Sequence, residues 1–154
     1  MSNDKKELAV AALRRGTVID HIPSSALFKA VKILGLEDMP QAVTIGYNLA
    51  SKKLGSKGII KVAEHLFDQS VIDRIALIAP TAVVNRIEDY TVVEKRRVAV
   101  PDTIVGIVRC TNPKCITNNE PMATKFDVVG REPETLIRCR YCNHTYTGSE
   151  AKIL

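Results

Sequence analysis

The sequence predicts an α+β protein built from two domains, residues 1–100 and 101–154. Three observations support this class. Segments typical of strands and helices alternate through the first hundred residues, in the order strands, helix, two strands, helix, two strands. All four cysteines lie after residue 109, and Pro101 interrupts the pattern between the two parts. We therefore expect a ferredoxin-like antiparallel sheet with two helices on one face, followed by a small all-β domain.

The N-terminal domain is expected to begin with two strands and a helix. Residues 8–13 and 17–22 are apolar and contain enough β-branched side chains to form strands. Ser24 is the predicted N-cap of the helix, because its hydroxyl can accept a backbone N–H of the first turn. Apolar residues then recur at helical spacing over 27–34, and Gly35 is a natural stop.

The rest of this domain is predicted to contain two strands, a second helix and a hairpin. Residues 42–49 predict a strand and residues 59–62 a shorter one. Asp68 can cap the second helix, and Pro80 ends it. Residues 82–96 then predict a hairpin of two strands.

The C-terminal domain is predicted to consist of short strands at residues 103–108, 124–129 and 135–138, with no convincing helix. It has only about fifty residues, which is too few for a generous hydrophobic core. A domain of this size needs another source of stability.

The cysteines fall into two close pairs that could supply it. Four residues separate Cys110 from Cys115, and two separate Cys139 from Cys142. Two short cysteine loops joined by a hairpin suit a tetrahedral, structural zinc ion, Zn(2+), with a closed ligand set. Two disulfides or four free thiols are the alternatives, and a reducing compartment argues against the first. His144 is not needed as a ligand and is expected at the surface.

Composition points to an ordinary globular protein. Of the 154 residues, 45% are hydrophobic and 25% are charged. The longest apolar stretch, residues 75–84, falls well short of the roughly 20 residues that cross a bilayer. The first ten residues are polar and lack the apolar region of a secretion signal. We therefore expect a cytoplasmic protein without a membrane partner.

The distribution of charge argues against a nucleic-acid-binding zinc domain. Residues 1–100 carry 15 basic and 11 acidic side chains, a net charge of +4, and residues 101–154 carry 7 and 6, a net charge of +1. Four thiolates on one Zn(2+) would contribute −2 and bring the second domain to about −1. Such a domain is a poor binder of phosphate backbones. The positive charge of the first domain could instead gather around a smaller anion.

Several residues of the first domain could bind such an anion. Lys61 and Lys95 end predicted strands and could converge on a phosphate, although solvated surface lysines would show the same spacing. Asp20 and His21 could contact ribose hydroxyls and phosphate, form a structural pair, or serve as an acid–base dyad. No nucleophile or open metal site accompanies them, which argues against an enzyme. The other basic candidates are Lys57, Arg14, Arg15, Arg96 and Arg97.

Four motifs follow one another along the chain: RRGTVIDHIP at 14–23, TIGYNL at 44–49, APTAVVNRIEDYTVVEK at 79–95 and the cysteine pairs. Together and in this order, they resemble one family, the regulatory chain of aspartate carbamoyltransferase. The resemblance implies a non-catalytic subunit that binds CTP as inhibitor and ATP as activator in de novo pyrimidine biosynthesis. It also implies a homodimer of regulatory chains that bridges catalytic trimers, with the zinc domain docked on the catalytic chain. Lys114 and Asn143 depart from the family pattern in the cysteine loops.

The resemblance also implies the residues of a nucleotide site. Asp20 and Lys61 would contact the ribose, His21 and Lys95 the triphosphate, and backbone groups near Leu13 the base. The full set carried over by position is Val10, Ala12, Leu13, Asp20, His21, Lys57, Lys61, Asn85, Ile87, Tyr90, Val92 and Lys95.

Overall fold

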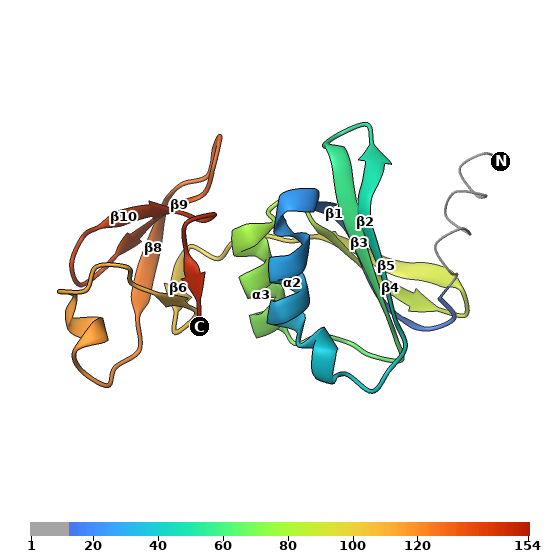
Figure 1. The fold of residues 1–154 in the computed structure, drawn as a ribbon, viewed down its shortest axis with the longest axis horizontal. Helices are drawn as coiled ribbons and strands as arrows, with labels where there is room; N and C mark the ends of the chain where they lie inside the picture. The colour runs from blue at the N-terminus through green and yellow to red at the C-terminus, as the bar shows by residue number, and fades with distance from the viewer. Residues whose placement is uncertain (1–12) are drawn as a thin grey trace. The chain divides into compact units, whose positions relative to one another are not determined.

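The computed structural model describes residues 13–154. The expected strand at 8–13 lies outside these residues except for Leu13, and Val10 and Ala12 lie outside them as well. Contacts between Cα atoms divide the chain into two compact units, Met1–Val98 and Ala99–Leu154 (Figure 1). None of the helices in the described residues is long and apolar enough to cross a membrane.

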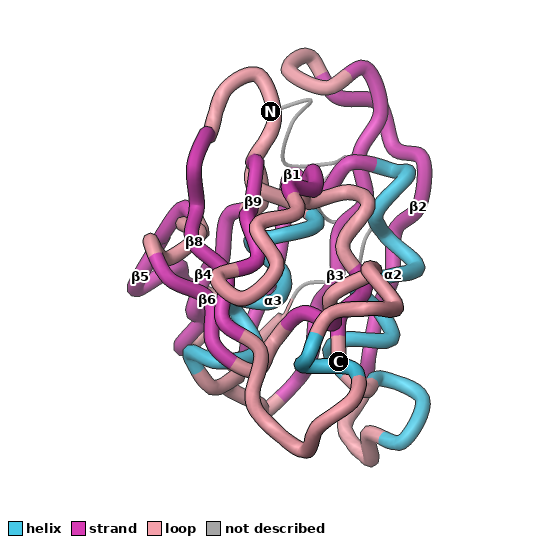
Figure 2. The backbone as a smooth tube through the Cα atoms, turned by 90° about the vertical axis from the view of Figure 1, so that its left-hand side faces the viewer, coloured by secondary structure: helices cyan, strands magenta, loops and turns pink. Residues whose placement is uncertain are grey.

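The N-terminal unit is an antiparallel sheet covered on one face by two helices (Figure 1). Its helices are α2 (Leu27–Leu34) and α3 (Gln69–Ile78). The described strands follow the order β2-β3-β1-β4-β5, and Figure 2 shows the two outer strands, β2 on the right and β5 on the left. This arrangement confirms the predicted fold class, with β5 added at one edge. The strands are β1 (Gly16–Pro23), β2 (Val43–Ser51), β3 (Gly55–Ala63), β4 (Val83–Glu88) and β5 (Thr91–Arg97).

Alternation along β3 shows which face of the sheet carries the helices. Ile60 and Val62 are fully buried, and a side chain at Gly58 would meet Leu27 of α2 at 2.7 Å. These positions therefore face the helices, and the residues between them, including Lys61, face the other way. Among residues 13–98, Figure 1 shows no helix on that second face, which we call the open face.

The start of the first helix corrects the prediction for Ser24. Residues Ser24–Ala26 form a 3-10 turn, and α2 begins only at Leu27 with Ala26 as its N-cap. The hydroxyl of Ser24 instead forms a hydrogen bond with Ser56 of β3, 2.9 Å away. The stop at Gly35 is confirmed, since this glycine has φ 66° and its N–H donates to the Lys32 carbonyl 3.1 Å away.

The second helix and β3 differ in extent from their predictions. Asp68 is the N-cap position of α3, although its side chain caps no backbone N–H. The strand expected over 59–62 runs from Gly55 to Ala63, because the tight hairpin with β2 pairs it as far as Ser51 and Gly55. A short 3-10 segment, Leu36–Asp38, follows α2.

The C-terminal unit is all-β, as predicted. Its four-stranded sheet has the order β10-β9-β8-β6, and two further strands pair separately. The strand expected over 103–108 is divided, because Gly106 at φ 67° turns the chain. Phe126 and Ile137 are fully buried in its small core. The elements are β6 (Thr103–Val105), β7 (Val108–Arg109), a 3-10 turn (Ile116–Asn118), β8 (Lys125–Gly130), β9 (Leu136–Cys139), β10 (Thr145–Thr147) and β11 (Lys152–Ile153).

Candidate functional site

The C-terminal unit brings the four cysteines into one cluster. Cys110 and Cys115 lie in the loop after β7, Cys139 ends β9, and Cys142 lies in the turn before β10. Their sulfur atoms all lie within 4.8 Å of one another, and three of the four residues are buried. His144 is exposed and lies outside this cluster.

The distances within the cluster fit a tetrahedral metal ion. Two contacts cross between the loops, 3.6 Å from Cys110 to Cys142 and 3.7 Å from Cys115 to Cys139. A tetrahedron with metal–sulfur bonds of about 2.3 Å has edges of about 3.8 Å, whereas a disulfide requires about 2.05 Å. The geometry therefore suits four thiolates around one ion and leaves no ligand position open for a substrate.

The ionisation of the cysteines differs across the cluster. Burial raises the pKa of Cys139 to about 12 and also raises the pKa of Cys110. Burial acts in the same direction on Cys142, but hydrogen bonds from the His144 backbone N–H, the Asn112 side chain and neighbouring thiols bring its pKa down to about 6. Cys110 and Cys139 must therefore lose protons when a metal binds.

Two hydroxyl groups contact the cluster, and both were missed in the sequence. The hydroxyl of Thr117 lies 3.1 Å from the sulfur of Cys115. The hydroxyl of Tyr146, from β10, lies 3.5 Å from the sulfur of Cys110. The pKa of Tyr146 is raised above its ordinary value, mainly by burial and secondly by this contact with Cys110. The phenol therefore keeps its proton. No spacing signal links Tyr146 to Cys110, because β10 itself was not predicted.

In the N-terminal unit, strand register aligns several candidate residues on the open face. Val18 of β1 pairs with Lys61 of β3 on one side and with Asn85 of β4 on the other. Asn85 in turn pairs with Lys95 of β5. Directly paired residues point to the same face of a sheet. We call this row, Lys61-Val18-Asn85-Lys95, the basic row.

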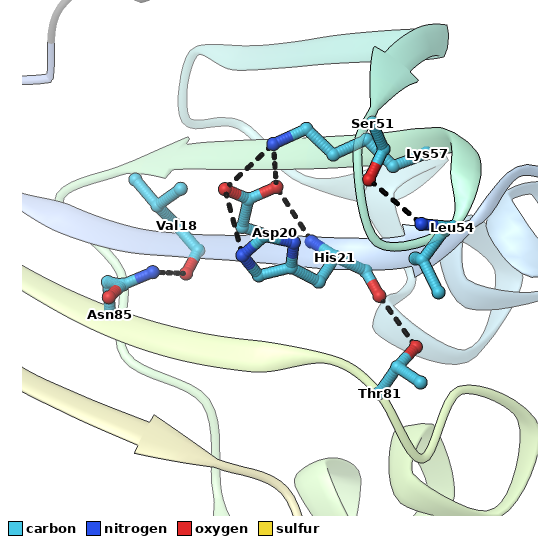
Figure 3. Close-up of polar contacts among 8 residues, drawn as sticks. All are labelled: Val18, Asp20, His21, Ser51, Leu54, Lys57, Thr81 and Asn85. Atoms are coloured by element: carbon cyan, nitrogen blue, oxygen red, sulfur yellow. Dashed lines mark hydrogen bonds and ion pairs between the residues drawn. The ribbon is translucent and has the colours of Figure 1, made fainter.

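Asp20 and Lys57 form an ion pair beside the basic row (Figure 3). The Lys57 ammonium lies 2.9 Å from Oδ1 of Asp20, and both side chains are about four-fifths buried, with 21% and 22% of their surface exposed. Asp20 Oδ1 also accepts the backbone N–H of His21 at 2.7 Å. The pair fixes Asp20 at the end of β1 that lies away from the β4–β5 turn.

A β-bulge gives His21 an unusual backbone. Ile19 pairs with Ile60 and Ile22 with Gly58, so β1 has one residue more than β3 between these pairs. His21 has φ 57°, a conformation that costs a non-glycine residue about 1 kcal/mol or more. Thr81 donates a hydrogen bond to the His21 carbonyl (Figure 3). Among the described residues, the buried Nδ1 of His21 has no hydrogen-bond partner.

The remaining candidates lie around the β4–β5 turn. Ile87 pairs with Gly16 of β1 and with Val92 of β5, which is 51% exposed. Tyr90 is 67% exposed, and its backbone N–H donates to the Arg14 carbonyl at 2.9 Å. Leu13 is half-buried.

The four arginines named as further candidates do not all lie on the open face. Arg96 pairs with Val84, which pairs with Ile19 on the helix-covered face, so Arg96 lies on the opposite face from Lys95. Arg15 lies 3.7 Å from Glu88 and is partly neutralised by it. Arg14 is exposed, and Arg97 pairs with Val83 at the end of β5.

Comparison with known proteins assigns both units. Residues 8–99 match the family described as aspartate carbamoyltransferase regulatory chain, allosteric domain, and residues 102–152 match the metal-binding domain of the same chain. The aspartate carbamoyltransferase regulatory chain of Bacteroides thetaiotaomicron is 53% identical over 154 residues and covers both chains completely. That of Parabacteroides distasonis is 56% identical over 138 residues, 90% of this chain and 89% of its own. That of Pyrococcus abyssi is 49% identical over 146 residues, 94% and 95% of the two chains.

An allosteric domain followed by a metal-binding domain defines a regulatory, non-catalytic subunit. The chain belongs to the family of aspartate carbamoyltransferase regulatory chains.

Proposed function

We propose that this chain binds CTP as inhibitor and ATP as activator at one site on the open face of its N-terminal sheet. It passes their effect to aspartate carbamoyltransferase catalytic chains in de novo pyrimidine biosynthesis. The observation that carries this proposal is the basic row, in which Lys61 and Lys95 flank Val18 and Asn85. Two ammonium groups on one face suit a polyanionic ligand that lies between them.

The neighbouring groups supply the other parts of a nucleotide site. Asp20 accepts from ribose hydroxyls and is oriented by Lys57. His21, whose buried Nδ1 lacks a partner among the described residues, donates a ring N–H to the triphosphate. Because the Tyr90 N–H is already bonded to Arg14, the backbone carbonyls near this turn are the groups that accept from a base. Carbonyl acceptors favour the exocyclic amino group that cytosine and adenine share.

The metal-binding domain provides the contact with the catalytic chain in this proposal. One structural zinc ion, held by Cys110, Cys115, Cys139 and Cys142, maintains a domain whose core is small. Large apolar side chains remain exposed there, among them Ile116 at 51% and Val129 at 44%. Exposed apolar surface on so small a domain suits a protein partner better than a nucleic acid.

The proposed assembly uses the edges of the N-terminal sheet. The two edge strands, β2 and β5, have unpaired backbone groups among the described residues. Pairing of two regulatory chains through this sheet gives a homodimer that can bridge two catalytic trimers. The assembled enzyme works in the cytoplasm, where thiolates stay reduced.

Two measurements test this function. In calorimetry, CTP and ATP should each bind the purified chain and compete with each other. In co-purification, a tagged chain should retain an aspartate carbamoyltransferase catalytic chain and lose it when a chelator removes the metal. A chain that binds neither nucleotide would refute the effector proposal, and a chain that retains its partner without metal would refute the role given to the metal domain.

A further inference from the structure

Tyr146 reaches the four-cysteine cluster from outside both cysteine loops. It lies in β10, pairs with Ile137 of β9, and places its hydroxyl oxygen 3.5 Å from the sulfur of Cys110. Its ring stacks on His144 and is tilted against buried Phe126, with centroid distances of 6.3 Å in both cases. The phenol is therefore held beside the cluster by ring contacts that do not depend on the hydrogen bond.

The direction of this hydrogen bond follows from the chemistry of the metal-bound state. A cysteine that binds a metal is a thiolate, so its sulfur has no proton to donate. The Tyr146 O–H must then be the donor and the Cys110 sulfur the acceptor. A hydrogen bond to an ionised acceptor is shorter and stronger than one between neutral groups.

The charge of the cluster explains why such a donor matters. Four thiolates and one divalent ion have a net charge of −2, which is costly in a largely buried site. The other side-chain hydroxyl, from Thr117, is only two residues from its sulfur partner Cys115 and belongs to the same loop. Tyr146 is 36 residues from Cys110 and belongs to another strand. Its hydrogen bond therefore joins the first cysteine loop to β10.

We propose that Tyr146 is a positioning residue of the metal centre. Its O–H donates to the Cys110 thiolate, which stabilises the anionic cluster and holds that sulfur in its metal-binding position. This inference rests on the proposed thiolate-bound zinc and is independent of the nucleotide effectors and of the catalytic chain.

The test removes one hydroxyl and keeps the ring. Tyr146→Phe retains the packing against Phe126 and His144, and Tyr141→Phe is the matched control. Tyr141 lies between Cys139 and Cys142, is 40% exposed, and in the described chain its hydroxyl makes no hydrogen bond to a cysteine sulfur. Zinc affinity of the full-length variants is measured by competition with a chromophoric chelator. We expect Tyr146→Phe to weaken zinc binding about 10- to 100-fold and the control to match wild type.

A spectroscopic measurement separates hydrogen bonding from packing. Cobalt(II) in a tetrahedral thiolate site gives a sulfur-to-metal charge-transfer band. The hydrogen bond lowers the energy of the sulfur lone pair, so its loss should move this band to longer wavelength in Tyr146→Phe and leave it in place in Tyr141→Phe.

Each other outcome contradicts the proposal. Unchanged zinc affinity in Tyr146→Phe would refute it while the zinc proposal stands. Weaker binding with an unmoved cobalt band would assign Tyr146 a packing role only. A wild-type chain that binds neither metal would refute both this inference and the proposed zinc site.

Discussion

Lys61 and Lys95 occupy the same row of the N-terminal sheet, with strands β1 and β4 between them. Three strand spacings of about 4.8 Å separate their Cα atoms by about 14 Å. Two extended lysine side chains can cover most of that distance from either side. The register therefore allows both ammonium groups to contact one ligand lying over Val18 and Asn85, although the two residues are 34 positions apart in the sequence.

Lys95→Ala should weaken CTP binding to the chain roughly 10- to 150-fold, the range for one hydrogen bond to a charged group. Arg96→Ala is the matched control, because it removes the same charge from the adjacent residue on the opposite face of β5. Calorimetric titration of both variants with CTP at one ionic strength tests this prediction. Equal losses in the two variants would mean that general charge, rather than a contact from Lys95, governs binding.

Gly58→Ala should destabilise the N-terminal unit by about 1–3 kcal/mol, because the added Cβ would lie 2.7 Å from a Leu27 methyl carbon. Leu27→Ala alone should cost about 2–5 kcal/mol, since Leu27 is fully buried. The double variant should lose less stability than the sum of the two, because the smaller side chain makes room for the new methyl. Chemical denaturation measures the free energy of unfolding of the two single variants and the double variant. Strict additivity would show that Gly58 and Leu27 do not contact each other in solution.

Metal affinity should rise with pH. Without metal, the raised pKa values of Cys110 and Cys139 keep both thiols protonated at neutral pH, so binding one ion releases at least two protons. Lowering the pH restores these protons and therefore opposes binding. Below the Cys142 pKa of about 6, this thiol is protonated as well. Metal binding then releases one more proton, so the affinity depends more steeply on pH. Calorimetry in buffers with different ionisation enthalpies counts the protons, and an affinity that does not change with pH would contradict this prediction.

Cys139→Ala, or removal of the metal by a chelator, should unfold the C-terminal unit and leave the N-terminal sheet and the homodimer intact. The physical reason is that Cys139 ends β9 inside a small domain, whereas the proposed dimer contact lies in the sheet of the other unit. Sedimentation and far-ultraviolet circular dichroism of the full chain, with and without chelator, test both parts. Dissociation to monomers on metal removal would place the dimer contact in the metal domain instead.

The elements that the sequence predicted correctly are those with a clear local signal. Apolar spacing over 27–34 and the glycine at 35 defined the first helix, because both depend on neighbours within one or two turns. The cysteine pairs predicted a four-sulfur cluster, because two cysteines with only two or four residues between them must share a loop. The alternation of strands and helices was enough to identify the ferredoxin-like plan.

Only the tertiary structure decided which residues face each other across strands. A period of two assigns a residue to a face of its own strand, but pairing sets the register that aligns Lys61 with Lys95. Contacts between distant segments also decide three other features: the bulge at His21, the Ser24 hydroxyl that bonds to Ser56 instead of capping a helix, and the position of Tyr146 beside Cys110. The composition and spacing of the sequence determined the kinds of elements and the pairing of the four cysteines. Long-range pairing and burial, which depend on segments far apart in the chain, determined how their side chains converge.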